Sequence, residues 1–168
     1  LILGMKLAKS LDRLGTETAF SVLAEAKKLE ATGKPMIHLG LGQPDFKTPQ
    51  HIVDAAKKAL DDGHHGYVLS NGILECRQAV TRKIKKLYNQ DIDPERIIIM
   101  PGGKPTMSYA IQCFGEPGVE IIHPTPAFPI YESMINFTGA KPVPYDLTED
   151  KDLKFNPEKI LSLITDKT

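Results

Sequence analysis

Residues 96–105 read RIIIMPGGKP, a short apolar run that ends in a glycine turn. The run at 97–100 predicts a buried β-strand, and the turn at 102–105 predicts entry into a helix that ends near Gly115. Strands are also predicted at 119–122 and 141–145, each followed by a helix, at 128–137 and 157–164. Because strands alternate with helices, we expect right-handed crossovers and a parallel sheet covered by helices.

The chain before residue 91 has a helical pattern instead. Helices are expected after the Thr16-Glu17-Thr18 cap as far as Gly33, from Thr48-Pro49 to Leu60, and from about Ile73 to Tyr88. We therefore divide the chain into an N-terminal arm and helical segment, 1–92, and the first part of a larger α/β domain, 93–168. The second part is expected to be truncated, because the sequence stops after a helix where another strand should follow.

Composition excludes several classes of function. Lys plus Arg and Asp plus Glu number 21 each, so no net charge favours nucleic acid or an acidic membrane surface. No run approaches the ~20 apolar residues that span a bilayer. Two cysteines without a CxxC partner suggest a reducing compartment, with the cytoplasm as the default location. No metal site is expected, because the five histidines lack partners at metal-ligand spacing.

Four places in the chain carry residues that could bind a ligand. At Gly102-Gly103-Lys104 a helix start would direct N–H groups and an ammonium at an anion, although a glycine turn with a solvated lysine is the alternative. The loop at 40–46 offers the Gly42 N–H to a small ligand, or is only a structural turn. Tyr67 could present a phenol to an anion and Phe128 a flat ring to a heteroaromatic group, or each could be an ordinary packed residue.

In series, these segments resemble the class I and II aminotransferases, the pyridoxal-phosphate enzymes of fold type I. The stretch LGLGQPDFKTP at 39–49 resembles the family's Gly-x-Pro-Asp-Phe-x-Thr-Pro segment. Further matches follow in the family's order: Ala55-Ala56, Ala59-Leu60, Tyr67, Gly72, Leu74-Glu75-Cys76-Arg77, Gly102-Gly103-Lys104, Pro117-Gly118, Pro124-Thr125-Pro126, Tyr131, Gly139 and Phe155-Asn156-Pro157. The resemblance implies a three-layer αβα fold, an incomplete aspartate aminotransferase-like large domain with a helical segment of the small domain before it.

The resemblance implies pyridoxal 5′-phosphate as the cofactor and assigns its binding residues. Gly102, Gly103 and Lys104 would hold the phosphate at the helix start, and Phe128 would stack on the pyridine ring. Tyr67 falls where the family's tyrosine reaches the phosphate in the neighbouring subunit, which implies a homodimer with shared active sites.

The resemblance also implies a reaction, the transfer of an amino group between an amino acid and a 2-oxo acid. Gly42 would meet the substrate carboxylate, and Phe20 lies in the segment that covers the substrate. No catalytic residue is assigned, because the family's Schiff-base lysine is expected beyond Thr168, and Lys104 does not match it. The chain alone is therefore expected to be inactive.

Other readings stay open at this point. A lyase of the same fold would share the cofactor site, and a non-catalytic aminotransferase-like module would share only the fold. A dehydrogenase-like Rossmann domain is the rival at the level of the fold, but the chain lacks GxGxxG.

Overall fold

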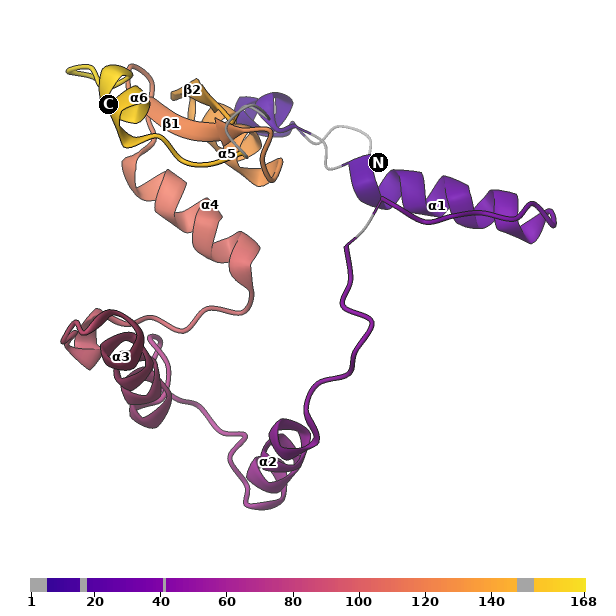
Figure 1. The fold of residues 1–168 in the computed structure, drawn as a ribbon, viewed down its shortest axis with the longest axis vertical. Coiled ribbons are helices and arrows are strands. Elements are labelled where there is room, and N and C mark those ends of the chain that lie inside the picture. The colour runs from indigo at the N-terminus through magenta and orange to yellow at the C-terminus, as the bar shows by residue number, and fades with distance from the viewer. Residues whose placement is uncertain (1–5, 16–17, 41, 148–152) are drawn as a thin grey trace. The chain divides into compact units, whose positions relative to one another are not determined.

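The computed structural model describes residues 6–15, 18–40, 42–147 and 153–168. The chain divides into two compact units. Figure 1 labels their helices and strands. The first unit consists of Leu1–Gly40 and Gly102–Thr168, and the second unit consists of Leu41–Pro101. The expected domain division at 92–93 stays a prediction, since compact units and the domains of a family need not coincide.

Most of the predicted elements are present, with bounds within a few residues of those expected. The first unit contains η1 (Lys9–Arg13), α1 (Thr18–Ala31), α4 (Gly103–Phe114), β1 (Glu120–Thr125), α5 (Ile130–Thr138), β2 (Lys141–Asp146) and α6 (Pro157–Ser162). The second unit contains α2 (Gln50–Asp61), α3 (Leu74–Tyr88) and η2 (Pro94–Arg96).

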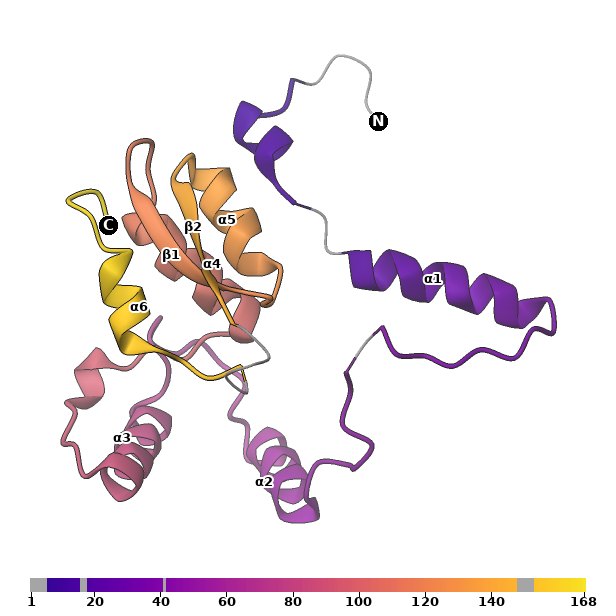
Figure 2. The ribbon, with the colours of Figure 1, turned by 45° about the horizontal axis from the view of Figure 1, so that its top comes forward.

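A parallel pair of strands forms the centre of the first unit (Figure 2). β1 and β2 run in register from Glu120 opposite Lys141 to Thr125 opposite Asp146, and α5 connects them. α4 packs against α5, which contacts both strands. Ile111, Ile135 and Ala140 are the buried hydrophobic cluster between these elements, and Val119, Ile121, Tyr131 and Met134 pack around it. This β-α-β arrangement confirms the expected α/β class.

Side chains fix the ends of α5 and α6. Arg13 donates from Nε to the Asn136 carbonyl at 2.8 Å and from Nη2 to the Phe137 carbonyl at 2.7 Å, so it bonds two carbonyls in the last turn of α5. The Asn156 side chain caps α6 by accepting from the Lys159 N–H. The buried Tyr145 of β2 holds α6 to the sheet, because its hydroxyl accepts the Asn156 N–H at 2.7 Å.

The predicted buried strand at 97–100 is wrong. Ile97 has extended backbone angles, φ −105° and ψ 131°, but no strand forms there. Ile98 is 65% exposed and Ile99 is 38% exposed. The physical reason is the lack of a partner, since an extended segment becomes a strand only beside another extended segment, and the described sheet contains β1 and β2 alone.

Among the described residues, no helix is long and apolar enough to cross a membrane.

Candidate functional site

Gly102 sets the direction in which α4 begins. It is the N-cap of α4, with φ 104° and ψ 163°, a backbone region that is open essentially to glycine alone. A Cβ at Gly102 would meet no atom closer than Pro105 Cδ at 3.9 Å, so the backbone angle, not crowding, requires glycine. The glycine therefore lets the extended segment before it turn directly into the helix.

The first turn of α4 is open to an anion. An α-helix leaves its first N–H groups without intrahelical acceptors, and the helix dipole places positive charge there. Gly102 and Gly103 are exposed, and the turn contains no acidic residue. Pro105 contributes no N–H, while Thr106 steadies the turn by donating from its hydroxyl to the Gly102 carbonyl at 3.1 Å. Residues 102–104 are the candidate site for a phosphate, and we call them the phosphate cradle.

Phe128 lies beside the phosphate cradle. It follows the carboxyl end of β1, and its ring centroid is 5.4 Å from Lys104 Nζ. The ring is partly exposed, at 39%. Open α/β sheets bind ligands at the carboxyl ends of their strands. The fold of the first unit therefore brings the aromatic ring of Phe128 to a helix start and an ammonium that lie more than twenty residues earlier in the sequence.

The other predicted site residues lie elsewhere in the chain. Tyr67 is fully exposed in the loop between α2 and α3, and Gly42 is exposed with open space around it. Both belong to the second unit. Phe20 lies in α1, and its side chain is outside the described residues. The roles of these three residues stay predictions.

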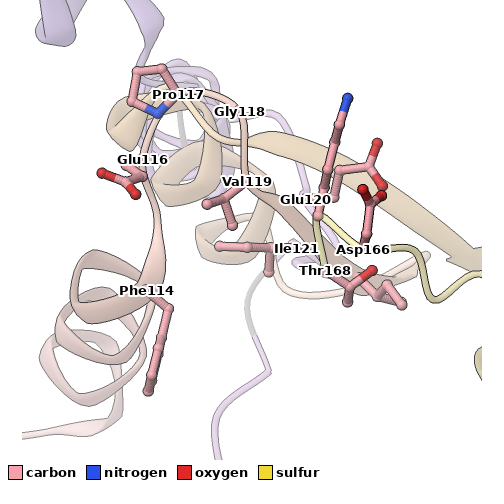
Figure 3. Close-up of a pocket in the computed structure, with 11 residues that line it drawn as sticks. Phe114, Glu116, Pro117, Gly118, Val119, Glu120, Ile121, Asp166 and Thr168 are labelled. Carbon is pink, nitrogen blue, oxygen red and sulfur yellow. The ribbon is translucent and has the colours of Figure 1, made fainter.

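A hollow in the first unit lies along β1, where the strand begins (Figure 3). It measures about 790 Å³, and Phe114, Val119 and Ile121 contribute apolar lining. Figure 3 shows Asp166 and Thr168 beside Glu120. The Glu120 N–H donates to the Lys167 carbonyl at 2.8 Å, so the C-terminal turn covers part of this strand edge. We interpret the hollow as the edge of a short sheet, because it contains no converging set of cationic or nucleophilic side chains.

Sequence reasoning assigned no role to Arg77, although the family resemblance included it. Its side chain is 2% exposed and donates to two carbonyls and one carboxylate. The sequence pattern did indicate that Arg77 is buried, because Arg77 lies three residues from Leu74 and three from Val80 on the apolar stripe of α3. Within the described ranges, no group of three or more His, Cys, Asp or Glu side chains could hold a metal ion.

These features define an α/β protein whose open helix start and neighbouring ring suit an anionic ligand with a flat ring. The sequence model for aminotransferase class I and II matches residues 34–168. The chain belongs to this family. Aspartate aminotransferase of Bacillus subtilis is 37% identical over 98% of the chain, and the (5-formylfuran-3-yl)methyl phosphate transaminase of Methanocaldococcus jannaschii is 38% identical over 96%.

Solved structures agree with the family. The aspartate aminotransferase from Thermus thermophilus with maleate matches with a TM-score of 0.89 and 29% identity over 98% of the chain. The alanine aminotransferase from Pyrococcus furiosus matches with a TM-score of 0.89 and 30% identity over 97% of the chain. The fold is therefore aspartate aminotransferase-like. The chain spans 42% of the length of both quoted sequence relatives, and 43% and 42% of these two solved chains.

Proposed function

We propose that the protein carrying this chain transfers an amino group between an amino acid and a 2-oxo acid, with pyridoxal 5′-phosphate as cofactor. The observation that carries the proposal is the cradle beside the ring, with Lys104 Nζ 5.4 Å from the centroid of Phe128. The names of the relatives quoted above, all aminotransferases or transaminases, favour transfer over a lyase reaction. Those names differ in their substrates, so the amino donor is left unassigned.

The residues of the cradle fit the cofactor in charge and shape. Its phosphate would accept from the N–H groups at the start of α4, where the helix dipole and Lys104 add positive charge. The exposed face of Phe128 would cover the cofactor ring and keep water from that side. When bound, the cofactor supplies an electron-withdrawing ring that makes the Cα proton of an amino acid acidic.

Lys104 is expected to change partner when phosphate binds. Its ammonium now lies over the ring of Phe128, a contact worth about 0.5–1 kcal/mol at an exposed site. A charge-assisted hydrogen bond to phosphate is stronger than this contact. Binding would therefore draw the ammonium toward the phosphate and free the ring face for stacking.

The remaining roles involve the second unit and a second copy of the chain. We propose that Tyr67 donates its hydroxyl to the phosphate bound by a partner subunit, so that a homodimer shares its sites. Gly42 would offer its N–H to the substrate carboxylate, and Phe20 would help to cover the substrate. The lysine that links the cofactor is proposed to lie outside residues 1–168, so this chain alone should not catalyse transfer. A cytoplasmic location also stays a prediction.

Cofactor retention tests the proposed function. The 168-residue chain is incubated with pyridoxal phosphate and desalted, and its absorption spectrum is recorded. We expect retained cofactor that inorganic phosphate displaces. After borohydride reduction and peptide mapping, no single lysine should be labelled specifically. A specific label on one lysine would contradict a linking lysine outside the chain, and failure to retain any cofactor would contradict the proposed half-site.

A negative charge introduced into the cradle separates binding from folding. Gly103→Asp places a carboxylate at the first position of α4, where acidic residues stabilise a helix but repel phosphate. We expect cofactor affinity to fall at least about tenfold through like-charge repulsion. Gln112→Glu is the matched control, because it adds the same charge to the exposed, opposite end of α4. Equal retention by both variants would contradict the cradle.

A further inference from the structure

Arg77 is a buried cation at the junction of three segments of the second unit. Its Nε donates to the Gly72 carbonyl at 3.2 Å, and its Nη1 donates to the Pro94 carbonyl at 3.0 Å and to Glu95 Oε1 at 2.8 Å. Glu95 itself is 67% exposed, while Arg77 is 2% exposed. A surface ion pair alone would leave the guanidinium in water. Its burial therefore points to the two carbonyls as the reason for its position.

Gly72 lies at the end of the loop that carries Tyr67. The Gly72 N–H donates to the Leu69 carbonyl at 2.9 Å, and the Ile99 N–H donates to the Asn71 carbonyl at 3.1 Å. Gly72 has φ +96°, and a Cβ there would lie 2.7 Å from Ile99 Cγ1. The end of the loop is thus held between Arg77 on one side and Ile99 on the other.

The start of the same loop is fixed by the end of α2. The Asp62 N–H donates to the Lys58 carbonyl at 2.8 Å, and the His64 N–H donates to the Ala59 carbonyl at 2.9 Å. Between these anchors Tyr67 is fully exposed and Val68 is 64% exposed. Few contacts of its own therefore hold the segment around Tyr67, so its conformational freedom is limited by the two anchored ends.

We propose that Arg77 is a positioning residue that sets cofactor affinity through Tyr67. This inference rests on the proposed function, in which the Tyr67 hydroxyl reaches a phosphate bound by a partner subunit. An exposed tyrosine on a loose loop must be ordered when it binds, and that ordering weakens affinity. Arg77 holds the Gly72 end of the loop to α3 and to residues 94–95. The loop is therefore partly ordered before the cofactor binds, and less conformational entropy is lost on binding.

A double-mutant cycle tests the proposal. Dissociation constants for pyridoxal phosphate are measured for the wild type, Tyr67→Phe, Arg77→Lys and the double variant. Loss of one hydrogen bond to a charged group predicts a roughly tenfold weaker affinity for Tyr67→Phe. Lysine keeps the buried charge but not the fork that bonds two carbonyls, so Arg77→Lys should also weaken affinity several-fold. The double variant should be no weaker than Tyr67→Phe, because Arg77 acts through Tyr67.

Controls separate this role from general stability. Arg82→Lys makes the same change at an exposed position of α3 and should leave affinity unchanged. If Arg77→Lys fails to fold, Gly72→Ala perturbs the same anchor through Ile99 and enters the cycle in its place. Hydrogen exchange at the Gly72 N–H should rise in either variant. A merely structural Arg77 would lower stability without this coupling to Tyr67.

The outcomes distinguish this proposal from the proposed function. If the wild type binds the cofactor, and Arg77→Lys has no effect or adds in full to Tyr67→Phe, the positioning role is wrong. It is also wrong if Tyr67→Phe leaves affinity unchanged. If the wild type does not bind the cofactor at all, the proposed function fails first, and the role of Arg77 falls with it.

Discussion

At the scale of single residues, Gly102 and Gly103 are adjacent glycines with different physical requirements. Gly102→Ala places a Cβ on a residue with φ 104° and ψ 163°, and should cost about 1–3 kcal/mol of stability. Gly103 is helical, and its added Cβ would meet only Met107 Cε at 3.6 Å, so Gly103→Ala should change stability by less than about 0.5 kcal/mol. Urea denaturation of both variants checks this difference. Equal destabilisation would show that the backbone angle of Gly102 is not what requires glycine.

A separate prediction concerns the aromatic ring of Phe128. Phe128→Leu keeps an apolar side chain but removes the flat face, so pyridoxal phosphate should bind roughly two- to tenfold more weakly. Phe128→Trp retains a flat face and should retain affinity. Phe114→Leu is the control, since Phe114 is 77% exposed at the other end of α4. Equal affinities for the Leu and Trp variants at position 128, measured by absorbance titration, would contradict stacking.

At the scale of elements, Glu120 joins β1 to two other parts of the first unit. Its carboxylate accepts from Lys141 Nζ at the start of β2 and from the Thr165 hydroxyl in the C-terminal turn, each at 2.8 Å. The hydrogen bonds from Lys141 and then Thr165 lower the pKa of Glu120 below its ordinary value of 4.5, although desolvation acts in the opposite direction. A lowered pKa in the folded state means that this stabilisation is complete above the ordinary value and is lost as the pH falls below it.

We therefore predict that the effect of Glu120→Gln on stability depends on pH. The variant should be less stable than the wild type at neutral pH, and the difference in stability should shrink as the pH falls below the ordinary value of 4.5 and the wild-type carboxylate gains its proton. Denaturant midpoints at the two pH values measure this change. Glu116→Gln, in the exposed turn before β1, should show no such convergence. A constant difference between wild type and Glu120→Gln would mean that the ion pair and hydrogen bond do not account for the stability of this junction.

The sequence was more informative about helices than about the sheet, for a physical reason. Caps and glycine stops are local, so α2, α3 and α4 begin and end close to the predicted positions. A strand depends on a neighbouring strand, which no local pattern supplies, and this is why the apolar run at 97–100 was wrongly predicted as a strand. The strand predicted at 119–122 is present, as β1 at Glu120–Thr125, because β2 lies beside it.

In the candidate site, too, the sequence predicts the features that depend on local chemistry and not those that depend on packing. The phosphate cradle follows from local chemistry, since glycines before a helix predict an open N-terminus. That Phe128 lies against Lys104 depends on how α4 packs against α5 and the sheet, so the residue pattern alone left Phe128 open as an ordinary core residue. The position of Arg77 on the apolar stripe of α3 indicated burial, but its acceptors are the backbone carbonyls of Gly72 and of Pro94 at the start of η2, which no residue pattern specifies.

At the scale of the whole molecule, the chain leaves much apolar surface uncovered. Ile37 and Leu39 are 86% and 89% exposed, and the described sheet has only two strands. Exposed apolar surface and unpaired strand edges favour association. We therefore expect the 168-residue chain to sediment as concentration-dependent oligomers, and Ile37→Lys with Leu39→Lys to reduce this association. A monodisperse monomer over a wide concentration range would contradict the prediction.

The proposed sharing of sites between two subunits can be tested by mixing defective chains. Gly103→Asp removes the cradle but keeps Tyr67, whereas Tyr67→Phe keeps the cradle but lacks the phenol. In a mixed dimer one site combines both defects, and the other combines an intact cradle with an intact tyrosine. Random pairing of equal amounts should therefore restore wild-type affinity to about one quarter of the sites. Titration at a cofactor concentration that saturates only the wild type measures this fraction. If the mixture instead shows only the average of the two variants, each Tyr67 does not serve the cradle of its partner.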